Sequence, residues 1–143
     1  MTDLPVGYPQ ITPYLAYEND RAAIAWLQKA FGFRVKHLVE QGGKIVHCEL
    51  EYGAGSVGIG NPDARARSPR SAGGAYSSSL YMFVDDVDAH FARAKAAGAV
   101  ILRELRTMEY GDRTYGCEDL EGHPWFFGQR VDEKAWEEAN RPR

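Results

Sequence analysis

Hydrophobic side chains first take up helical spacing shortly after the start of the chain. Ile24, Leu27 and Phe31 recur at intervals of three and four residues, which predicts an amphipathic helix with one apolar stripe. Asp20 is the predicted cap of this helix, because a short acidic side chain can accept from the free backbone N–H groups of the first turn. Gly32 is typical of a helix end. Strand-like alternation of apolar and polar residues flanks the helix on both sides.

A second helix of the same kind is predicted in the second half of the chain. Asp86 is its predicted cap, and Val87, Phe91 and Ala94 form its apolar stripe. Gly98 stands where the helix should end. The two helices therefore occupy corresponding places in two similar halves.

The stretches 43–60 and 111–128 show the duplication most clearly. Each begins and ends with glycine and reads as a long strand, a tight turn and a short strand. The strand-like segments TPYLAYEND, from Thr12, and SLYMFVDDV, from Ser79, also correspond. Each half therefore reads as strand, helix and three strands. The sequence predicts an α+β fold in which two tandem βαβββ modules form a curved mixed sheet around a cavity, with the helices on the outside.

The predicted organisation is a single domain over residues 1–143. The first module covers 11–60, and the second covers 79–128. Residues 61–78 are rich in Pro, Gly, Ser and Arg and are predicted to be a linker. Residues 129–143 are predicted to form a tail that contains a short helix.

Composition and charge narrow the class of protein. The net charge of −3 argues against general nucleic-acid binding, which normally uses a basic face. No apolar run approaches the roughly 20 residues of a membrane helix, so no membrane partner is expected. The first ten residues lack the features of a signal peptide, and two cysteines do not make a disulfide framework. We therefore expect a cytoplasmic protein.

Strand alternation places an unusual set of side chains on the sheet face away from the helices. That face is predicted to carry Tyr14, His47, Glu49, Tyr81, Phe83, Tyr115, Cys117 and Phe126. It has too many aromatic residues for a surface facing water, and its His and Glu residues suit a dry core poorly. Aromatic walls with a few polar groups are typical of a ligand pocket. The alternative is that the two sheets close on each other and the aromatic residues fill the gap.

Three segments resemble the vicinal oxygen chelate superfamily, which includes glyoxalase I, bleomycin-resistance proteins and extradiol dioxygenases. These are ITPYLAYEN with the following helix that ends in FGF, LYMFVDDVDAHFARAKAAGA, and YGDRTYGCEDLEGHPWFFG. The chain looks most like bacterial glyoxalase/bleomycin-resistance-like proteins of undefined substrate. The resemblance implies paired βαβββ modules and a homodimer.

Metal-dependent members of this superfamily place their ligands at four equivalent positions on the first and last strands of the two halves. Those positions here look like Thr12, Gly58, Ser79 and Phe126. None is a usual metal ligand, since such sites use imidazole, carboxylate or thiolate groups. We therefore expect a cavity without a metal or other cofactor.

Candidate chemistry rests on His47, Glu49 and Cys117. His47 and Glu49 form an H-x-E pair on one strand face, suited to acid–base work, and Cys117 is a candidate nucleophile. The trio is also a candidate for an atypical metal centre, and the alternative is a polar patch that binds water or ligand. No partners are apparent from the sequence for His37, in a strand, or for His90, on the surface of a helix.

The function expected from the sequence is the binding, with or without transformation, of a small aromatic or apolar organic molecule. The predicted ligand-contacting residues are Thr12, Tyr14, Ser79, Tyr81, Phe83, Tyr115 and Phe126. Two alternatives stay open. One is a metal-dependent lyase, isomerase or dioxygenase with an atypical centre, and the other is a non-catalytic protein that sequesters a drug.

Overall fold

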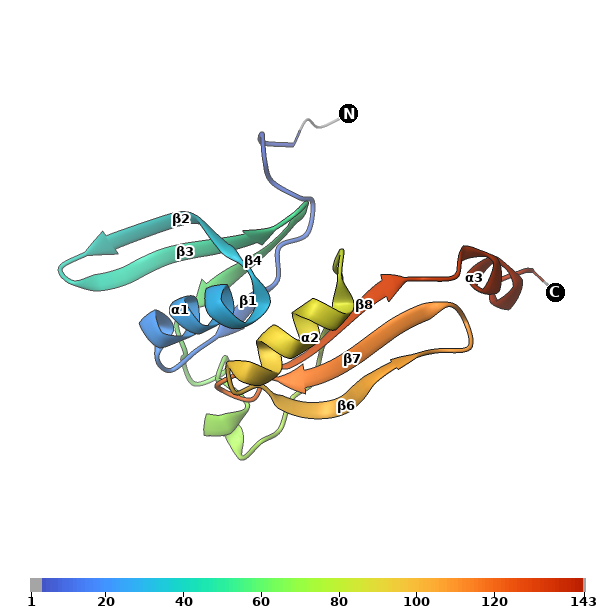
Figure 1. Cartoon of the computed structure of the whole chain (residues 1–143). Helices are drawn as coiled ribbons and strands as arrows, with labels where there is room; N and C mark the ends of the chain where they lie inside the picture. Colours follow the sequence, from blue (N-terminus) through green and yellow to red (C-terminus); the bar gives the residue numbers. More distant parts are fainter. Residues whose placement is uncertain (1–3, 143) are drawn as a thin grey trace.

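The first half of the chain folds into a four-stranded mixed sheet and one helix (Figure 1). The computed structural model describes residues 4–142. The first module contains β1 (Tyr14–Ala16), α1 (Asp20–Phe31), β2 (Arg34–Gln41), β3 (Lys44–Tyr52) and β4 (Gly55–Gly60). The strand order is β1-β4-β3-β2, in which β1 runs parallel to β4 and the other pairs are antiparallel.

The second half repeats this arrangement. It contains β5 (Leu80–Phe83), α2 (Val87–Ala96), β6 (Val100–Thr107), β7 (Asp112–Glu118) and β8 (Pro124–Arg130), in the strand order β5-β8-β7-β6. The predicted α+β fold of two βαβββ modules is therefore confirmed.

The linker and the tail each contain a short helix. The segment between the modules includes a single 3-10 turn, η1 (Arg70–Ala72), and the tail contains α3 (Glu133–Ala139). Residues 1–3 and 143, at the ends of the predicted domain, lie outside the described residues. Every helix within residues 4–142 is too short or too polar to cross a membrane.

Both long helices begin and end at the residue types that local chemistry favours, with one shift. Asn19, not Asp20, caps α1, since its side chain accepts from the backbone N–H of Ala22 at 3.1 Å. Both residue types can fill this position, so the sequence alone did not separate them. Asp86 caps α2 as predicted. Gly32 ends α1 in the left-handed region at a φ of 84°, which only glycine adopts without strain.

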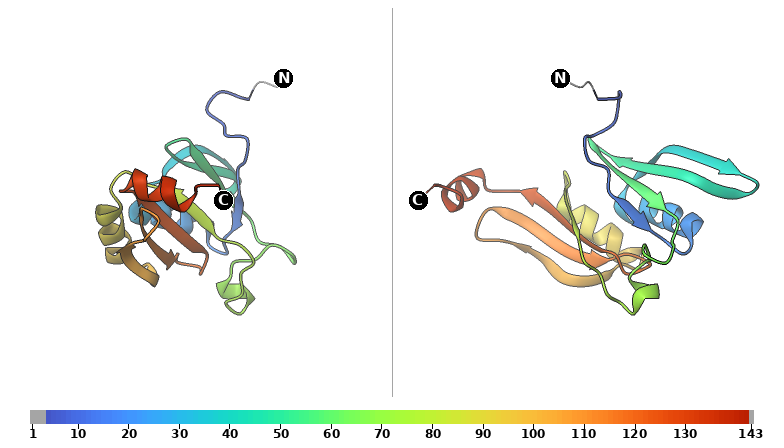
Figure 2. Two further views of the ribbon diagram at one scale, coloured as in Figure 1. Left: turned by 90° about the vertical axis from the view of Figure 1, so that its right-hand side faces the viewer. Right: turned by 180° about the vertical axis from the view of Figure 1, so that it is seen from behind.

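The two modules pack together through their helical sides. Phe31 at the end of α1 contacts the second sheet, with ring centroids 5.2 Å from Trp125 and 4.7 Å from Phe127. Trp26 on α1 donates from its indole nitrogen to the carbonyl of Ala97, just beyond α2, at 2.9 Å. The two sheets spread apart on either side of the helix pair (Figures 1 and 2). The sheets are therefore open, and they do not close around a cavity within one chain.

The turn between β7 and β8 fastens the second module to the first. The carboxylate of Glu121 accepts from the backbone N–H groups of Glu18 and Asn19, at 2.7 and 3.0 Å, just before α1. His123 donates from Nε2 to the carbonyl oxygen of Ala16, at the end of β1, at 2.7 Å. Both contacts satisfy backbone groups that an edge strand and a helix start leave open.

Asp119 holds the same turn from inside. Its Oδ2 accepts from the hydroxyl of Tyr17 at 2.6 Å and from the indole nitrogen of Trp125 at 3.0 Å, and all three residues are buried. Its Oδ1 accepts from the backbone N–H groups of Glu121 and His123. One carboxylate thus joins the end of β1 to the start of β8, and a buried carboxylate with four donors is well satisfied.

Candidate functional site

The first sheet carries an aromatic ring that lies directly over a glycine. Tyr14 on β1 is paired in register with Gly58 on β4. A Cβ atom at Gly58 would collide with the ring carbons of Tyr14, so the absence of a side chain there lets the ring lie down on the sheet. The Tyr14 residue is 54% exposed, so its outer face remains open.

The second sheet repeats this arrangement at two places. Phe126 on β8 lies over its in-register partner Gly116 on β7, and a Cβ there would meet the ring carbons. Tyr81 on β5 places its hydroxyl end over Gly128. Tyr81 and Phe126 are themselves paired in register, so the two residues lie on the same face of the sheet. This face is therefore an aromatic surface backed by glycines.

Exposure is high for the aromatic residues on β5. Tyr81 is 46% exposed and Phe83 is 56% exposed, and their rings contact each other edge to face at a centroid distance of 5.4 Å. The aromatic contacts between the modules run instead through the helical sides, as for Phe31 with Trp125. The two aromatic faces of one chain thus do not cover each other.

A polar group stands beside Tyr14 on the first sheet. Glu49 on β3 is paired with Gly58 on one side and with His37 on the other. The Tyr14 hydroxyl donates to Oε1 of Glu49 at 2.9 Å, and Nε2 of His47 lies 3.5 Å from the same oxygen. The His37 ring is 5.1 Å from the His47 ring. His37 therefore belongs to this cluster, and its place opposite Glu49 depends on a β2–β3 register that the sequence pattern did not supply.

Burial and hydrogen bonding at this cluster are uneven. The Glu49 side chain is 8% exposed, whereas that of His47 is 36% exposed. Oε2 of Glu49 is buried, and it accepts no hydrogen bond from any residue of the described chain, 4–142. Partial burial, followed by the hydrogen bond to Glu49, raises the pKa of Tyr14, so its hydroxyl stays a donor at neutral pH.

The predicted placement of Tyr115 and Cys117 on this face is corrected by the structure. Both are fully buried in the helix-side core. Strand pairing makes Gly116, not Cys117, the counterpart of Glu49. Glu49 is paired with Gly58, which is paired with Tyr14 on the first strand of its module. In the same way, Gly116 is paired with Phe126, which is paired with Tyr81. Counted between these paired residues, the β7–β8 connection is one residue longer than the β3–β4 connection. A shift of one residue turns every side chain of a strand to the opposite face of the sheet.

The trio of His47, Glu49 and Cys117 therefore does not come together. Cys117 lies in the core of the other module, where burial raises the pKa of its thiol to about 12. Within residues 4–142, no three His, Cys, Asp or Glu residues are grouped closely enough to hold a metal ion. An atypical centre built from these three residues is thus ruled out by their positions.

His90 is buried in the core instead of lying on the surface of α2. Its Nε2 donates to the carbonyl of Phe31 at 2.9 Å, so its Nδ1 accepts from the Tyr115 hydroxyl at 2.6 Å. Burial lowers the pKa of His90. The spacing of Val87, His90 and Ala94 by three and four residues is the signal that places His90 on the buried stripe.

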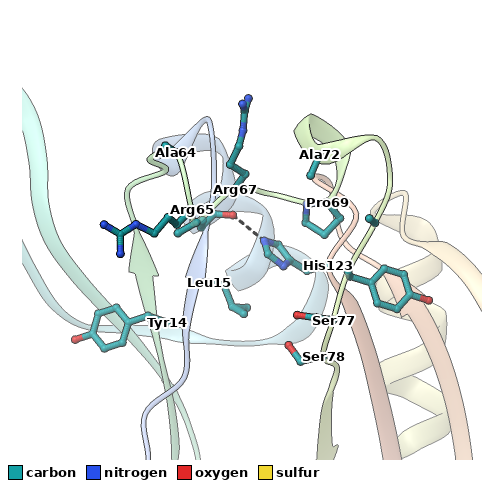
Figure 3. A pocket seen from close by; sticks show the side chains of 14 residues that line it. Tyr14, Leu15, Ala64, Arg65, Arg67, Pro69, Ala72, Ser77, Ser78 and His123 are labelled. Carbon is teal, nitrogen blue, oxygen red and sulfur yellow. Dashed lines mark hydrogen bonds between the residues drawn. The ribbon is translucent and has the colours of Figure 1, made fainter.

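A hollow of about 560 Å³ lies between β1 and the linker, and Tyr14 is one of the residues that line it (Figure 3). Small side chains such as Ala64, Ser77 and Ser78 make up much of its lining. Arg65 and Arg67 direct their guanidinium groups away from the space between β1 and the segment that leads into β5 (Figure 3). The aromatic residues of its lining are Tyr14, Tyr76 and His123, and of these only Tyr14 also belongs to a glycine-backed sheet face. The glycine-backed faces carry Tyr14, Tyr81 and Phe126 and are the better candidate site.

Comparison with known proteins identifies the family. Residues 9–127 match the family model described as Glyoxalase/Bleomycin resistance protein/Dioxygenase superfamily. The chain belongs to this superfamily. The match covers the first module, the linker and the second module as far as the middle of β8, and it confirms the family suggested by the three sequence segments.

Relatives of known sequence or structure fit this membership. The chain is 31% identical over 137 residues to an uncharacterized protein of Mycobacterium bovis, a match that covers 91% of this chain and 89% of the relative. The crystal structure of TioX from Micromonospora sp. ML1 is 36% identical with a TM-score of 0.70, and the match covers 86% of this chain and 99% of TioX. The fosfomycin resistance protein FosX from Listeria monocytogenes, at 13% identity, a TM-score of 0.65 and coverage of 90% and 97%, shares the fold.

The positions at which metal-dependent members of the superfamily are expected to hold a metal do not suit one here. Thr12 and Ser79 lie just before β1 and β5, and they offer only hydroxyl groups. Gly58 is covered by the Tyr14 ring, and Phe126 is itself a ring lying over Gly116. A site with no imidazole, carboxylate or thiolate does not fit a divalent catalytic metal.

Proposed function

We propose that this member of the superfamily binds a planar small organic molecule on its glycine-backed aromatic faces, and that each binding site is completed by a second copy of the chain. The observation that carries the proposal is the arrangement of Tyr14 over Gly58, Phe126 over Gly116 and Tyr81 over Gly128. The half-exposed rings of Tyr14 and Tyr81 offer surface for stacking, the geometry that a planar ligand requires, while Arg103 lies over the Phe126 ring.

The need for a second copy follows from the packing of the modules. The helices fill the space between the sheets, so the aromatic face of each sheet is open in one chain (Figure 2). Half-exposed Tyr14, Tyr81 and Phe83 form surfaces of the kind that mark ligand or protein contacts. In the proposed dimer, the first-sheet face of one chain and the second-sheet face of its partner form the two walls of one cavity. Thr12 and Ser79 lie at the edges of these walls and contact the ligand there.

Binding without a chemical step is the function that the geometry supports best. The face offers His47 and Glu49 for acid–base work, but it has no nucleophile beside them, because Cys117 lies in the core. Stacking surfaces with few polar groups favour capture of a ligand over its transformation. Sequestration of an aromatic compound is therefore the proposed role.

The test is binding of acridine, a planar uncharged probe, followed by its fluorescence. We expect Tyr14→Ala and Tyr81→Ala each to weaken binding by about tenfold, since a buried aromatic contact contributes about 1 kcal/mol or more beyond its area. Tyr76→Ala is the matched control, because Tyr76 is 53% exposed and lines the hollow at the linker, as Tyr14 does, but lies on neither glycine-backed face. Equal losses in all three variants, or a loss in Tyr76→Ala alone, would contradict the proposal.

A further inference from the structure

We infer that Glu49 selects ligands that carry an N–H donor, and preferably a positive charge, on the planar ring system. The inference rests on the proposed function and deepens it by naming the class of ligand. It makes Glu49 the recognition residue for aromatic amines and protonated nitrogen heterocycles. The argument starts from the two oxygens of one buried carboxylate.

The two oxygens of Glu49 differ in what they contact. Oε1 accepts from the Tyr14 hydroxyl at 2.9 Å and faces Nε2 of His47 at 3.5 Å. Oε2 is buried and accepts nothing from residues 4–142. A buried acceptor without a donor is costly, and a carboxylate oxygen is among the strongest acceptors in proteins. The unpartnered oxygen thus lies on the proposed binding face with its full capacity to accept.

The cationic side chains near this face already have other partners. Lys36 donates to the Ser56 hydroxyl at 2.9 Å and lies 4.0 Å from the centroid of the Tyr8 ring. Arg34 pairs with Glu51 at 3.1 Å. Neither cation is paired with Glu49.

The wall that a second copy would supply shows the same pattern. Arg103 donates from Nη2 to Thr114 at 3.0 Å and lies over the Phe126 ring, while its Nε is buried and has no acceptor within residues 4–142. Arg130 pairs with Asp112 at 2.8 Å. Because Nε of Arg103 is buried on its own sheet and the other cations have partners, the donor for Oε2 is assigned to the ligand.

The position of Glu49 fixes where the donor sits on the ligand. Glu49 and Tyr14 are both neighbours of Gly58, and the hydroxyl of that tyrosine contacts the carboxylate directly. A ring stacked on Tyr14 therefore brings its own edge toward Oε2. Because Oε2 is covered in the free chain, an N–H in the plane of the ligand, or directly attached to it, reaches this oxygen once the Glu49 side chain turns toward the open face.

The test measures the affinity of the protein for three acridines of similar size. 9-Aminoacridine is a cation with N–H donors at neutral pH, acridine is neutral without a donor, and acridine-9-carboxylate is an anion. We expect the wild-type protein to bind 9-aminoacridine at least about tenfold more tightly than acridine, in line with a hydrogen bond to a charged group. Acridine-9-carboxylate should bind most weakly of the three.

Glu49→Gln is the decisive variant. A glutamine keeps the shape and can still accept from Tyr14 through its carbonyl oxygen, while its NH₂ group replaces Oε2 and is a donor. The preference for 9-aminoacridine should disappear, and acridine-9-carboxylate should gain affinity. Glu51→Gln, two residues along the same strand and paired with Arg34, is the matched control and should keep the wild-type order. Thermal unfolding of each variant confirms that the comparison is made on folded protein.

The outcomes distinguish the role of Glu49 from the proposed function on which it rests. Equal affinities for the three probes in the wild-type protein, or an unchanged preference in Glu49→Gln, would overturn the role of Glu49 and leave planar-ligand binding intact. Failure of all three probes to bind the wild-type protein would overturn the proposed function itself.

Discussion

Glu49 and Gly116 occupy equivalent positions in the two modules. Each is paired across its sheet with the residue that neighbours the first-strand tyrosine, Gly58 in one module and Phe126 in the other. The first module uses the position for a buried carboxylate, whereas the second uses it as space for an aromatic ring. At this position the surface of the first module is thus acidic, and the surface of the second is aromatic.

The space above Gly58 should be essential for the first of these surfaces. Gly58→Ala would force the Tyr14 ring away and break its hydrogen bond to Glu49, so we expect acridine affinity to fall by about tenfold. Gly60→Ala is the control, because an added Cβ would meet only the Leu15 backbone, at 3.5 Å or more. Fluorescence titration of the two variants gives the comparison, and similar affinities would argue against the glycine-backed ring.

His90 should make stability depend on pH below about 6.5. Its pKa in the folded protein is lowered by burial from the ordinary value of 6.5, so the unfolded chain binds a proton more readily than the folded one. Its contribution to stability is therefore complete above pH 6.5, and it is lost as the pH falls, by at most about 1.4 kcal/mol per pH unit. Urea unfolding across this range measures the slope, which should flatten in His90→Gln. A slope that survives this substitution would show that another group is responsible.

Glu121 should stabilise the contact between the modules. Glu121→Ala removes the acceptor of two backbone N–H groups before α1, and we expect it to lower the free energy of unfolding by about 1–2 kcal/mol. Glu109→Ala, a change at an exposed glutamate, should alter it by less than about 0.5 kcal/mol. Chemical denaturation measures both, and equal effects would contradict the role of Glu121.

The two cysteines should be unreactive in the folded protein. Both are fully buried, and burial raises the pKa of Cys48 to about 11 and that of Cys117 to about 12. Because the thiolate is the reactive form, Ellman's reagent at pH 7.5 should label neither residue until the protein is unfolded in urea. Rapid labelling of Cys117 in native protein would place it back among the candidate nucleophiles.

The sequence predicted the modules well because their signals are local. Helix spacing, capping residues and turn glycines all belong to single elements, and the in-register pair Tyr81 and Phe126 shares a face as alternation predicts. Tyr115 and Cys117 were misplaced because a turn longer by one residue reverses a strand, and low identity between the repeats hides that residue.

The arrangement of the modules was beyond the sequence for a different reason. Both the helical and the open side of each sheet carry apolar residues, so periodicity does not show which sides meet. The position of His90 between Phe31 and Tyr115 depends on that arrangement, as does the spread of the two sheets. Ligand binding by Thr12, Tyr14, Ser79, Tyr81, Phe83 and Phe126 stays a prediction.

The claim that each site is shared between two copies has a direct test in mixed dimers. Tyr14→Ala damages one wall and Tyr81→Ala the other, so each variant alone lacks an intact site. Unfolding and refolding the two variants together should restore tight acridine binding to about a quarter of the wild-type stoichiometry. Half of the dimers are then mixed, and each has one intact site of two. Recovery of that fraction is the result we predict, and no recovery in a mixture shown to contain mixed dimers would contradict the shared site.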